Sequence, residues 1–121
     1  MTRRYSQRRC AYWSEAPATP AEYVFLTRAR ERLRGLLFRE PDEKVRVLVP
    51  CGAVHTVGMA HEIDIAFLDG EGTVLAAYKR VGKRRRLSCA GACMTLERFA
   101  DDRPWFTVGD RVGLESISRK G

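Results

Sequence analysis

The strongest constraint on the fold is residues 63–72, where an alternating apolar stretch runs directly into a glycine-rich turn. Residues 63–68 read IDIAFL, so large apolar side chains recur at every second position, which is the period of a β-strand with one buried face. Residues 69–72 read DGEG, and glycine adopts the positive backbone angles that hairpin turns require. This segment predicts the first strand and the turn of a β-hairpin, whose second strand covers residues 73–80.

Further short strands are expected around this hairpin, and one helix before it. The strands cover residues 22–26, 45–49, 84–87, 92–99 and 111–116. Apolar residues recur at helical spacing after Thr27, a residue type that caps helices, so a helix is expected over residues 28–38. The predicted fold is α+β and mainly β: a compact, barrel-like antiparallel β domain with one helix near its N-terminal side. Its expected core consists of Leu33, Leu36, Phe38, Ile63, Ile65, Phe67 and Leu96.

Composition is that of a globular protein with one domain. Of the 121 residues, 45% are hydrophobic and 31% are charged, which excludes wholesale disorder. Residues 1–20 are expected to form an irregular basic arm, and residues 21–121 a single β-rich domain. The longest uncharged stretch, residues 47–60, contains two glycines and a proline, so it falls short of the run of about 20 apolar residues that a membrane span needs. The N-terminus has no apolar secretion signal, and a cytoplasmic location is therefore expected.

Positive charge is concentrated in the two flanks of the chain, whereas the middle is acidic. The net charge is +7, and residues 79–121 carry eleven Lys/Arg against five Asp/Glu, whereas residues 41–78 carry two against six. Six cations occupy eight consecutive positions with no acid among them: Lys79, Arg80, Lys83, Arg84, Arg85 and Arg86. Such a run either attracts phosphate backbones and other polyanions, or it is simply the solvent-exposed side of a strand pair and its turn, which keeps the protein soluble. Since the run contains no aromatic residue, stacking on single-stranded bases is not expected.

The four cysteines are expected to be free thiols. The chain contains Cys10, Cys51, Cys89 and Cys93. Disulfides are disfavoured in the reducing cytoplasm that we expect for this protein. Three residues separate Cys51 from His55 and Cys89 from Cys93, a spacing that zinc sites also use. The glycine that follows the second cysteine of a zinc knuckle is missing, so we expect neither a metal nor another cofactor. Whether the four potential ligands meet in space stays open.

A candidate pocket lies in residues 51–59, a mostly uncharged segment that contains His55 and Thr56. Buried polar groups need hydrogen-bond partners, so these two residues are either structural or line a pocket together with Asp64 and Cys89. The connection over residues 58–62 is short, which should keep His55 and Asp64 close. Asp64 lies between two isoleucines and either accepts hydrogen bonds from backbone amides of the preceding turn, pairs with an arginine or faces the pocket.

Several motifs occur in the order found in one known family. They are RGLLFR at residues 34–39, VHTVGM at 54–59, IDIAFLD at 63–69 and GDRV at 109–112. In this order and spacing the chain resembles the domain-of-unknown-function 192 family, over about residues 28–114. The resemblance bears on the fold and implies no particular activity.

Three classes of function are compatible with these features. We expect a small accessory domain that binds a ligand or a protein, without catalysis, through a pocket or patch beside His55. The alternative is weak binding of nucleic acid or another polyanion through residues 79–86. The third class is a hydrolase or transferase with Cys51 or Cys89 as nucleophile, His55 as base and Asp64 as the group that orients the base. It requires a thiol or carboxylate within hydrogen-bond reach of His55.

Overall fold

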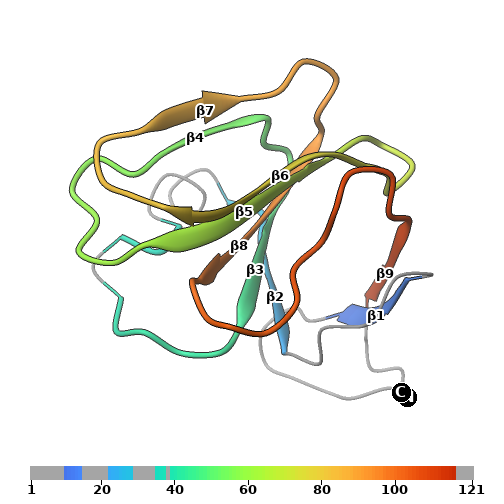
Figure 1. Cartoon of the computed structure of the whole chain (residues 1–121). Coiled ribbons are helices and arrows are strands. Elements are labelled where there is room, and N and C mark those ends of the chain that lie inside the picture. Colours follow the sequence, from blue (N-terminus) through green and yellow to red (C-terminus); the bar gives the residue numbers. More distant parts are fainter. Residues whose placement is uncertain (1–9, 15–21, 29–34, 38, 117–121) are drawn as a thin grey trace.

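A computed structural model of the chain describes residues 10–14, 22–28, 35–37 and 39–116. Nine strands lie within these residues (Figure 1). They are β1 (Cys10–Ser14), β2 (Tyr23–Leu26), β3 (Val45–Leu48), β4 (Ala53–His55), β5 (Ile63–Leu68), β6 (Val74–Val81), β7 (Arg86–Ser88), β8 (Met94–Phe99) and β9 (Val112–Ser116). The prediction of a mainly β fold is confirmed.

The strands form one central sheet and two small ones. The central sheet has the order β2-β3-β8-β5-β6, and its pairs are antiparallel except for the parallel pair β2–β3. The strands β4 and β7 pair as a separate antiparallel ribbon, called here the β4–β7 ribbon, and β1 pairs with β9. The predicted barrel-like closure is wrong, because β2 and β6 are the edges of an open sheet in the described part of the chain.

The predicted helix is not supported. Most of residues 28–38 lie outside the described residues; of those described, Arg28 lies in a bend and residues 35–37 form a turn. Gly35 has a φ of 50°, which is unsuited to a helix interior. No helix in the described residues has the length and apolar character to cross a bilayer.

The N-terminal arm differs in part from its prediction. Residues 10–14, expected within an irregular arm, form β1 and pair with β9 near the other end of the chain. The remaining residues of that arm lie outside the described ranges.

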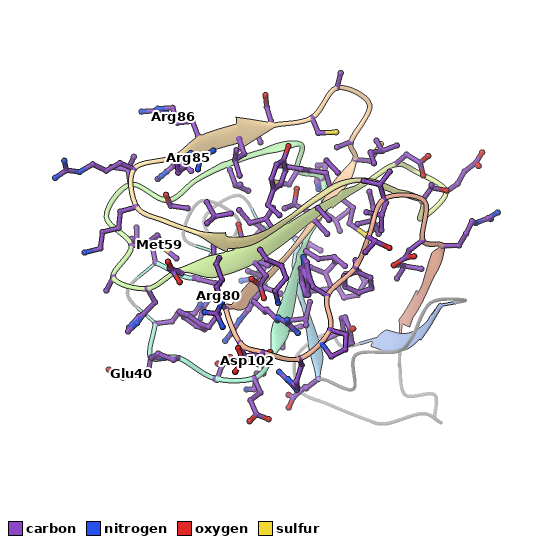
Figure 2. All side chains as sticks on the ribbon, viewed as in Figure 1. Glu40, Met59, Arg80, Arg85, Arg86 and Asp102 are labelled. Atoms are coloured by element: carbon purple, nitrogen blue, oxygen red, sulfur yellow. The ribbon has the colours of Figure 1, made fainter. Side chains whose placement is uncertain are left out.

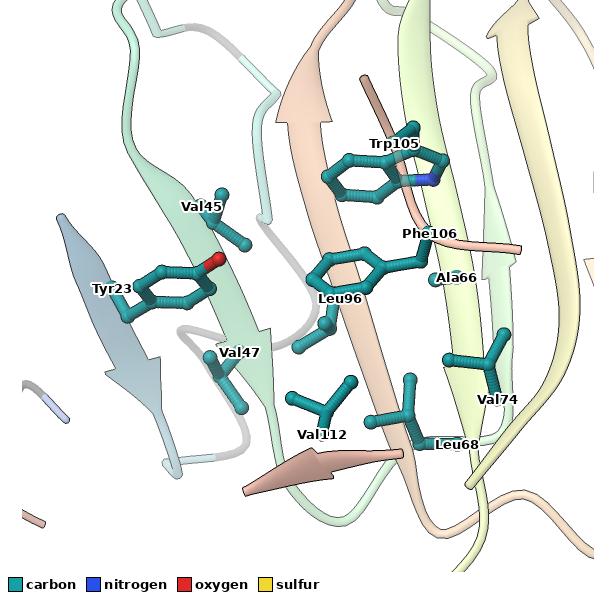
Figure 3. Packing of buried hydrophobic residues seen from close by; sticks show 10 residues of the cluster. All are labelled: Tyr23, Val45, Val47, Ala66, Leu68, Val74, Leu96, Trp105, Phe106 and Val112. Atoms are coloured by element: carbon teal, nitrogen blue, oxygen red, sulfur yellow. The ribbon is translucent and has the colours of Figure 1, made fainter. Parts of the chain in front are cut away.

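One face of the central sheet is covered by the segment that follows β8. Trp105 and Phe106 lie over Leu96 and Ala66 in a cluster that also contains Val112 from β9 (Figure 3). The indole Nε1 of Trp105 donates a hydrogen bond of 3.1 Å to the carbonyl oxygen of Ile65, so the covering segment is tied to β5.

The opposite face packs beneath the β4–β7 ribbon. Ile63, Ile65 and Phe67 alternate onto this face and are at most 1% exposed. They contact Val54 and Leu87, the inward-facing residues of the ribbon. Five predicted core residues are confirmed as buried: Leu36, Ile63, Ile65, Phe67 and Leu96. Leu33 and Phe38 lie outside the described residues.

The predicted hairpin turn lies at residues 69–72. The Oδ1 atom of Asp69 accepts hydrogen bonds from the amides of Glu71 (2.8 Å) and Thr73 (3.0 Å). These backbone hydrogen bonds lower the pKa of Asp69. Gly72 has a φ of 88°, and a Cβ atom there would collide with the carbonyl oxygen of Val112. The turn therefore requires glycine at this position.

Candidate functional site

Four adjacent cations form an exposed cluster at the connection from β6 to β7. Lys83, Arg84, Arg85 and Arg86 are all exposed, and we call them the basic cluster. Among the described residues, no carboxylate forms an ion pair with any of these four side chains. Figure 2 shows Arg86 projecting from the start of β7 away from the central sheet. The charge of the cluster is therefore available to an external anion.

The two other cations of the predicted run have partners within the chain. The Nζ atom of Lys79 lies 3.6 Å from a carboxylate oxygen of Asp64 and donates a hydrogen bond of 3.1 Å to the carbonyl oxygen of Asp101. Arg80 contacts Asp102 at 2.7 Å and Glu62 at 3.6 Å. The run of six cations thus divides into a paired part, which holds the segment after β8, and the basic cluster.

Thr56 fixes the backbone of the turn that carries the cluster. Its hydroxyl donates to the carbonyl oxygen of Gly82 (2.7 Å) and accepts from the amide of Arg85 (2.8 Å). Its own amide donates to the carbonyl oxygen of Arg85 (2.9 Å). Since Thr56 is 1% exposed, it is a structural residue beneath the cluster rather than a pocket wall. The turn holds Arg84 at a φ of 59°, which costs energy for a residue other than glycine.

The outward face of the β4–β7 ribbon joins the two candidate sites of the sequence. His55 and Arg86 are direct cross-strand partners, and Ala53 faces Ser88 two pairs further along, on the same face of the ribbon. These four exposed residues, with Val54 and Leu87, line an open hollow of about 300 Å³. Sequence reasoning proposed His55 and Arg86 separately and missed Ser88. The signal that could have found Ser88 is its place two residues after Arg86 on a strand, which puts both side chains on one face.

Asp64 lies apart from this hollow in a buried ion pair. Its Oδ2 accepts a hydrogen bond of 2.7 Å from Nε of Arg98, and its Oδ1 accepts one of 2.8 Å from the amide of Arg80. Both side chains of the pair are 0% exposed. The Nη2 atom of Arg98 donates to the carbonyl oxygen of Arg103 (2.7 Å), and its guanidinium lies 4.6 Å from the ring centroid of Trp105. The predicted pairing of Asp64 with an arginine is thus confirmed, whereas the backbone amide that it binds belongs to Arg80 in β6 and not to the preceding turn. Through Arg98, Asp64 anchors the segment after β8.

The cysteines do not combine with His55. The Nδ1 atom of His55 accepts a hydrogen bond of 3.2 Å from the amide of Val57, and within the described residues neither a thiol nor a carboxylate is bonded to the ring. Cys89 packs beneath the ribbon, against the apolar cluster that contains Ile63, Ile65 and Phe67. Cys51 and Cys93 are adjacent through a backbone hydrogen bond of 3.0 Å, and both are free thiols. No group of three potential metal ligands occurs among the residues that the structure places.

A second buried acid, Glu97, was not singled out from the sequence. It lies in β8 opposite Arg46 of β3 and is 4% exposed. Both Nη atoms of Arg46 donate hydrogen bonds to the carboxylate of Asp42, at 2.7 and 2.9 Å. Burial raises the pKa of Glu97 to about 7, against a smaller lowering by the nearby Arg46 charge. Its Oε1 lies 2.8 Å from the position that a Cβ atom on Gly35 would take, so the carboxyl is covered by the turn at residues 35–37.

Comparison with known proteins relates this chain to others by fold. No model of a known protein family matches it, and no curated protein matches its sequence. The structure is similar to that of a protein of unknown function from Novosphingobium aromaticivorans, with a TM-score of 0.67, 16% identity and coverage of 88% of this chain and 83% of the other. It is also similar to a "putative transcription regulator" from Sinorhizobium meliloti, with a TM-score of 0.70, 12% identity and coverage of 92% and 95%. At these identities the similarity shows a shared fold and nothing about activity.

Proposed function

We propose that the protein is a binding domain without catalysis, and that the surface formed by the basic cluster and the β4–β7 ribbon binds polyanions. The observation that carries this proposal is the set of four exposed cations, Lys83 to Arg86, with no acidic partner among the described residues. Charges of one sign on one short turn attract phosphate groups over a distance of about one Debye length, roughly 8–10 Å at ordinary salt.

The expected binding mode is contact with the phosphate backbone rather than with bases. No aromatic side chain lies between Lys79 and Arg86, so the cluster has no platform on which single-stranded bases would stack. Binding should therefore be weak, independent of sequence and strongly dependent on salt. That a protein of similar fold is described as a transcription regulator is compatible with this proposal.

Membership of the domain-of-unknown-function 192 family is part of the same proposal. Its support is the order of the four motifs along residues 28–114. The segment VHTVGM contributes His55 and Thr56, which stand respectively on the β4–β7 ribbon and beneath the turn of the basic cluster. In this proposal the motif supports a binding surface and supplies no catalytic group.

The test is the affinity for a fluorescently labelled DNA duplex, measured by anisotropy at several salt concentrations. Four cations in contact with phosphates predict a slope of log K against log salt of about −3.6, so affinity should fall by about 150-fold between 50 and 200 mM salt. The double variant Lys83→Gln with Arg85→Gln should reduce the magnitude of this slope by about two.

A matched control removes two cations elsewhere. Lys44 and Arg111 lie away from the basic cluster, in the segments before β3 and before β9, so Lys44→Gln with Arg111→Gln lowers the net charge equally. This control should retain the slope of the unmodified protein. An equal loss in both double variants would mean that net charge, and not the cluster, attracts the duplex. Salt-resistant or sequence-selective binding would also contradict the proposal.

A further inference from the structure

The outward face of the β4–β7 ribbon presents three polar side chains around a hollow. The cross-strand pairs His55–Arg86 and Ala53–Ser88 lie on the same face of the ribbon, with the pair Val54–Leu87 between them. Arg86, His55 and Ser88 therefore surround the space that the small Ala53 side chain leaves open. Val54 and Leu87 point the other way, into the apolar cluster that contains Ile63, Ile65 and Phe67. This packing fixes the ribbon against the sheet. The three polar groups are therefore held on a packed element and not on a free loop.

The hydrogen bonding of His55 determines what its ring can offer a ligand. The Nδ1 atom accepts a hydrogen bond from the amide of Val57 at 3.2 Å, so in the neutral ring the proton is on Nε2. Nε2 is consequently a donor. A guanidinium, an Nε2–H group and a hydroxyl are thus the donors that the lining residues offer, and no carboxylate of the described residues lines the hollow.

We propose that this hollow is a binding site for a single phosphoryl group, with Arg86, His55 and Ser88 as its ligands. The guanidinium of Arg86 binds two phosphoryl oxygens through its paired N–H groups. The Nε2–H of His55 and the hydroxyl of Ser88 donate to the third oxygen and to the free lone pairs of the other two. A hollow of about 300 Å³ is large enough for a phosphoryl group together with the first atoms of the group that bears it.

This site deepens the proposed function and rests on it, because the hollow adjoins the basic cluster through Arg86. The cluster attracts a polyanion without selectivity, whereas the hollow distinguishes a terminal phosphoryl group from an internal phosphodiester. A terminal group exposes three oxygens to the three donors, and an internal one exposes two. The same chemistry would also bind free inorganic phosphate, so the experiment includes both sources.

The experiment is an NMR titration of the full-length, ¹⁵N-labelled protein. The chain has two histidines, and His61, which packs edge-on against Phe99, serves as an internal reference. Inorganic phosphate is added at constant pH and ionic strength against sodium chloride. We expect a saturable shift of the His55 Nε2 resonance and of the amides of Arg86 and Ser88, with His61 unchanged. A dinucleotide with a 5′-terminal phosphate should produce the same shift at lower concentration than the same dinucleotide without it.

Variants separate the hollow from the basic cluster. Arg86→Gln should weaken phosphate binding by about tenfold or more, and Ser88→Ala by about threefold to tenfold, since each removes a donor to a charged group. Ser88→Thr keeps the hydroxyl and should retain binding, and His61→Gln should have no effect. Lys83→Gln with Arg85→Gln should weaken duplex binding but change the affinity for inorganic phosphate by less than about threefold, because both side chains lie outside the hollow.

The outcomes distinguish the two proposals. If the duplex binds through the cluster and phosphate shifts His55 no more than chloride does, the phosphoryl site is overturned and the proposed function stands. If phosphate saturates the hollow and the duplex fails to bind at low salt, polyanion binding is overturned and the phosphoryl site stands. Equal affinity of the two dinucleotides would overturn the preference for a terminal group.

Discussion

Replacement of Glu97 by glutamine should remove a pH dependence of stability that the fold builds into its central strand. Burial raises the pKa of Glu97 from 4.5 to about 7. The folded protein therefore keeps a proton that the unfolded chain releases between these two values. The contribution of this group is most favourable below pH 4.5 and is lost as the pH rises to 7. The loss amounts to about 3 kcal/mol, since each unit of pKa corresponds to about 1.4 kcal/mol.

The assay is urea unfolding of the unmodified protein and of Glu97→Gln between pH 4 and pH 8. Glutamine keeps the shape of the side chain and carries no charge. As the pH rises from 4 to 8, the free energy of unfolding of the variant minus that of the unmodified protein should therefore increase by about 3 kcal/mol. Glu71→Gln, at an exposed position of the hairpin turn, is the matched control and should show a constant difference. Parallel pH profiles for the unmodified protein and Glu97→Gln would refute the reasoning.

Three further predictions concern stability, each measured by chemical denaturation. Asp64→Asn leaves the guanidinium of Arg98 buried without its counter-charge and should lower the free energy of unfolding by about 3–5 kcal/mol. Asp102→Asn, at a side chain that is 99% exposed, should change this free energy little. Equal effects of the two variants would contradict the buried pair. Gly72→Ala should lower the free energy of unfolding by about 1–3 kcal/mol, because Gly72 has a φ of 88° and a Cβ atom there would meet the carbonyl oxygen of Val112. Gly82→Ala is the control, since a Cβ atom at that position would meet no other atom within 4 Å. Thr56→Val should cost about 1–3 kcal/mol by leaving two backbone groups unsatisfied, and Thr56→Ser should restore most of this loss; failure of that rescue would show that the hydroxyl is not what holds the turn.

The local features of the fold could be predicted from the sequence, and the long-range ones could not. The hairpin of β5 and β6 is encoded within residues 63–81 by alternation and by a glycine turn, and both signals act between near neighbours. The pairing of β1 with β9 joins Cys10 to Ser116, and no local pattern indicates such a partner. The strand Ala53–His55 was missed because three residues are too few to show a period.

The same distinction applies to the candidate site. The basic run is visible in the sequence, but its division is not, because Lys79 and Arg80 find partners at Asp101 and Asp102 more than twenty positions away. The pairing of Asp64 with Arg98, which removes Asp64 from any pocket, spans 34 positions. The neighbourhood of His55 and Arg86 likewise depends on the register of the β4–β7 ribbon, which only the folded chain defines.

The most direct test of the polyanion-binding surface is to map the backbone amides that respond to a DNA duplex at low salt. We expect shifts confined to residues 53–57 and 82–88, the ribbon and the turn that carries the basic cluster. They should disappear as salt is raised to near-physiological concentration, and a duplex of unrelated sequence should produce the same map. Shifts centred on residues 41–43 and 101–103, or no shifts at low salt, would contradict the account.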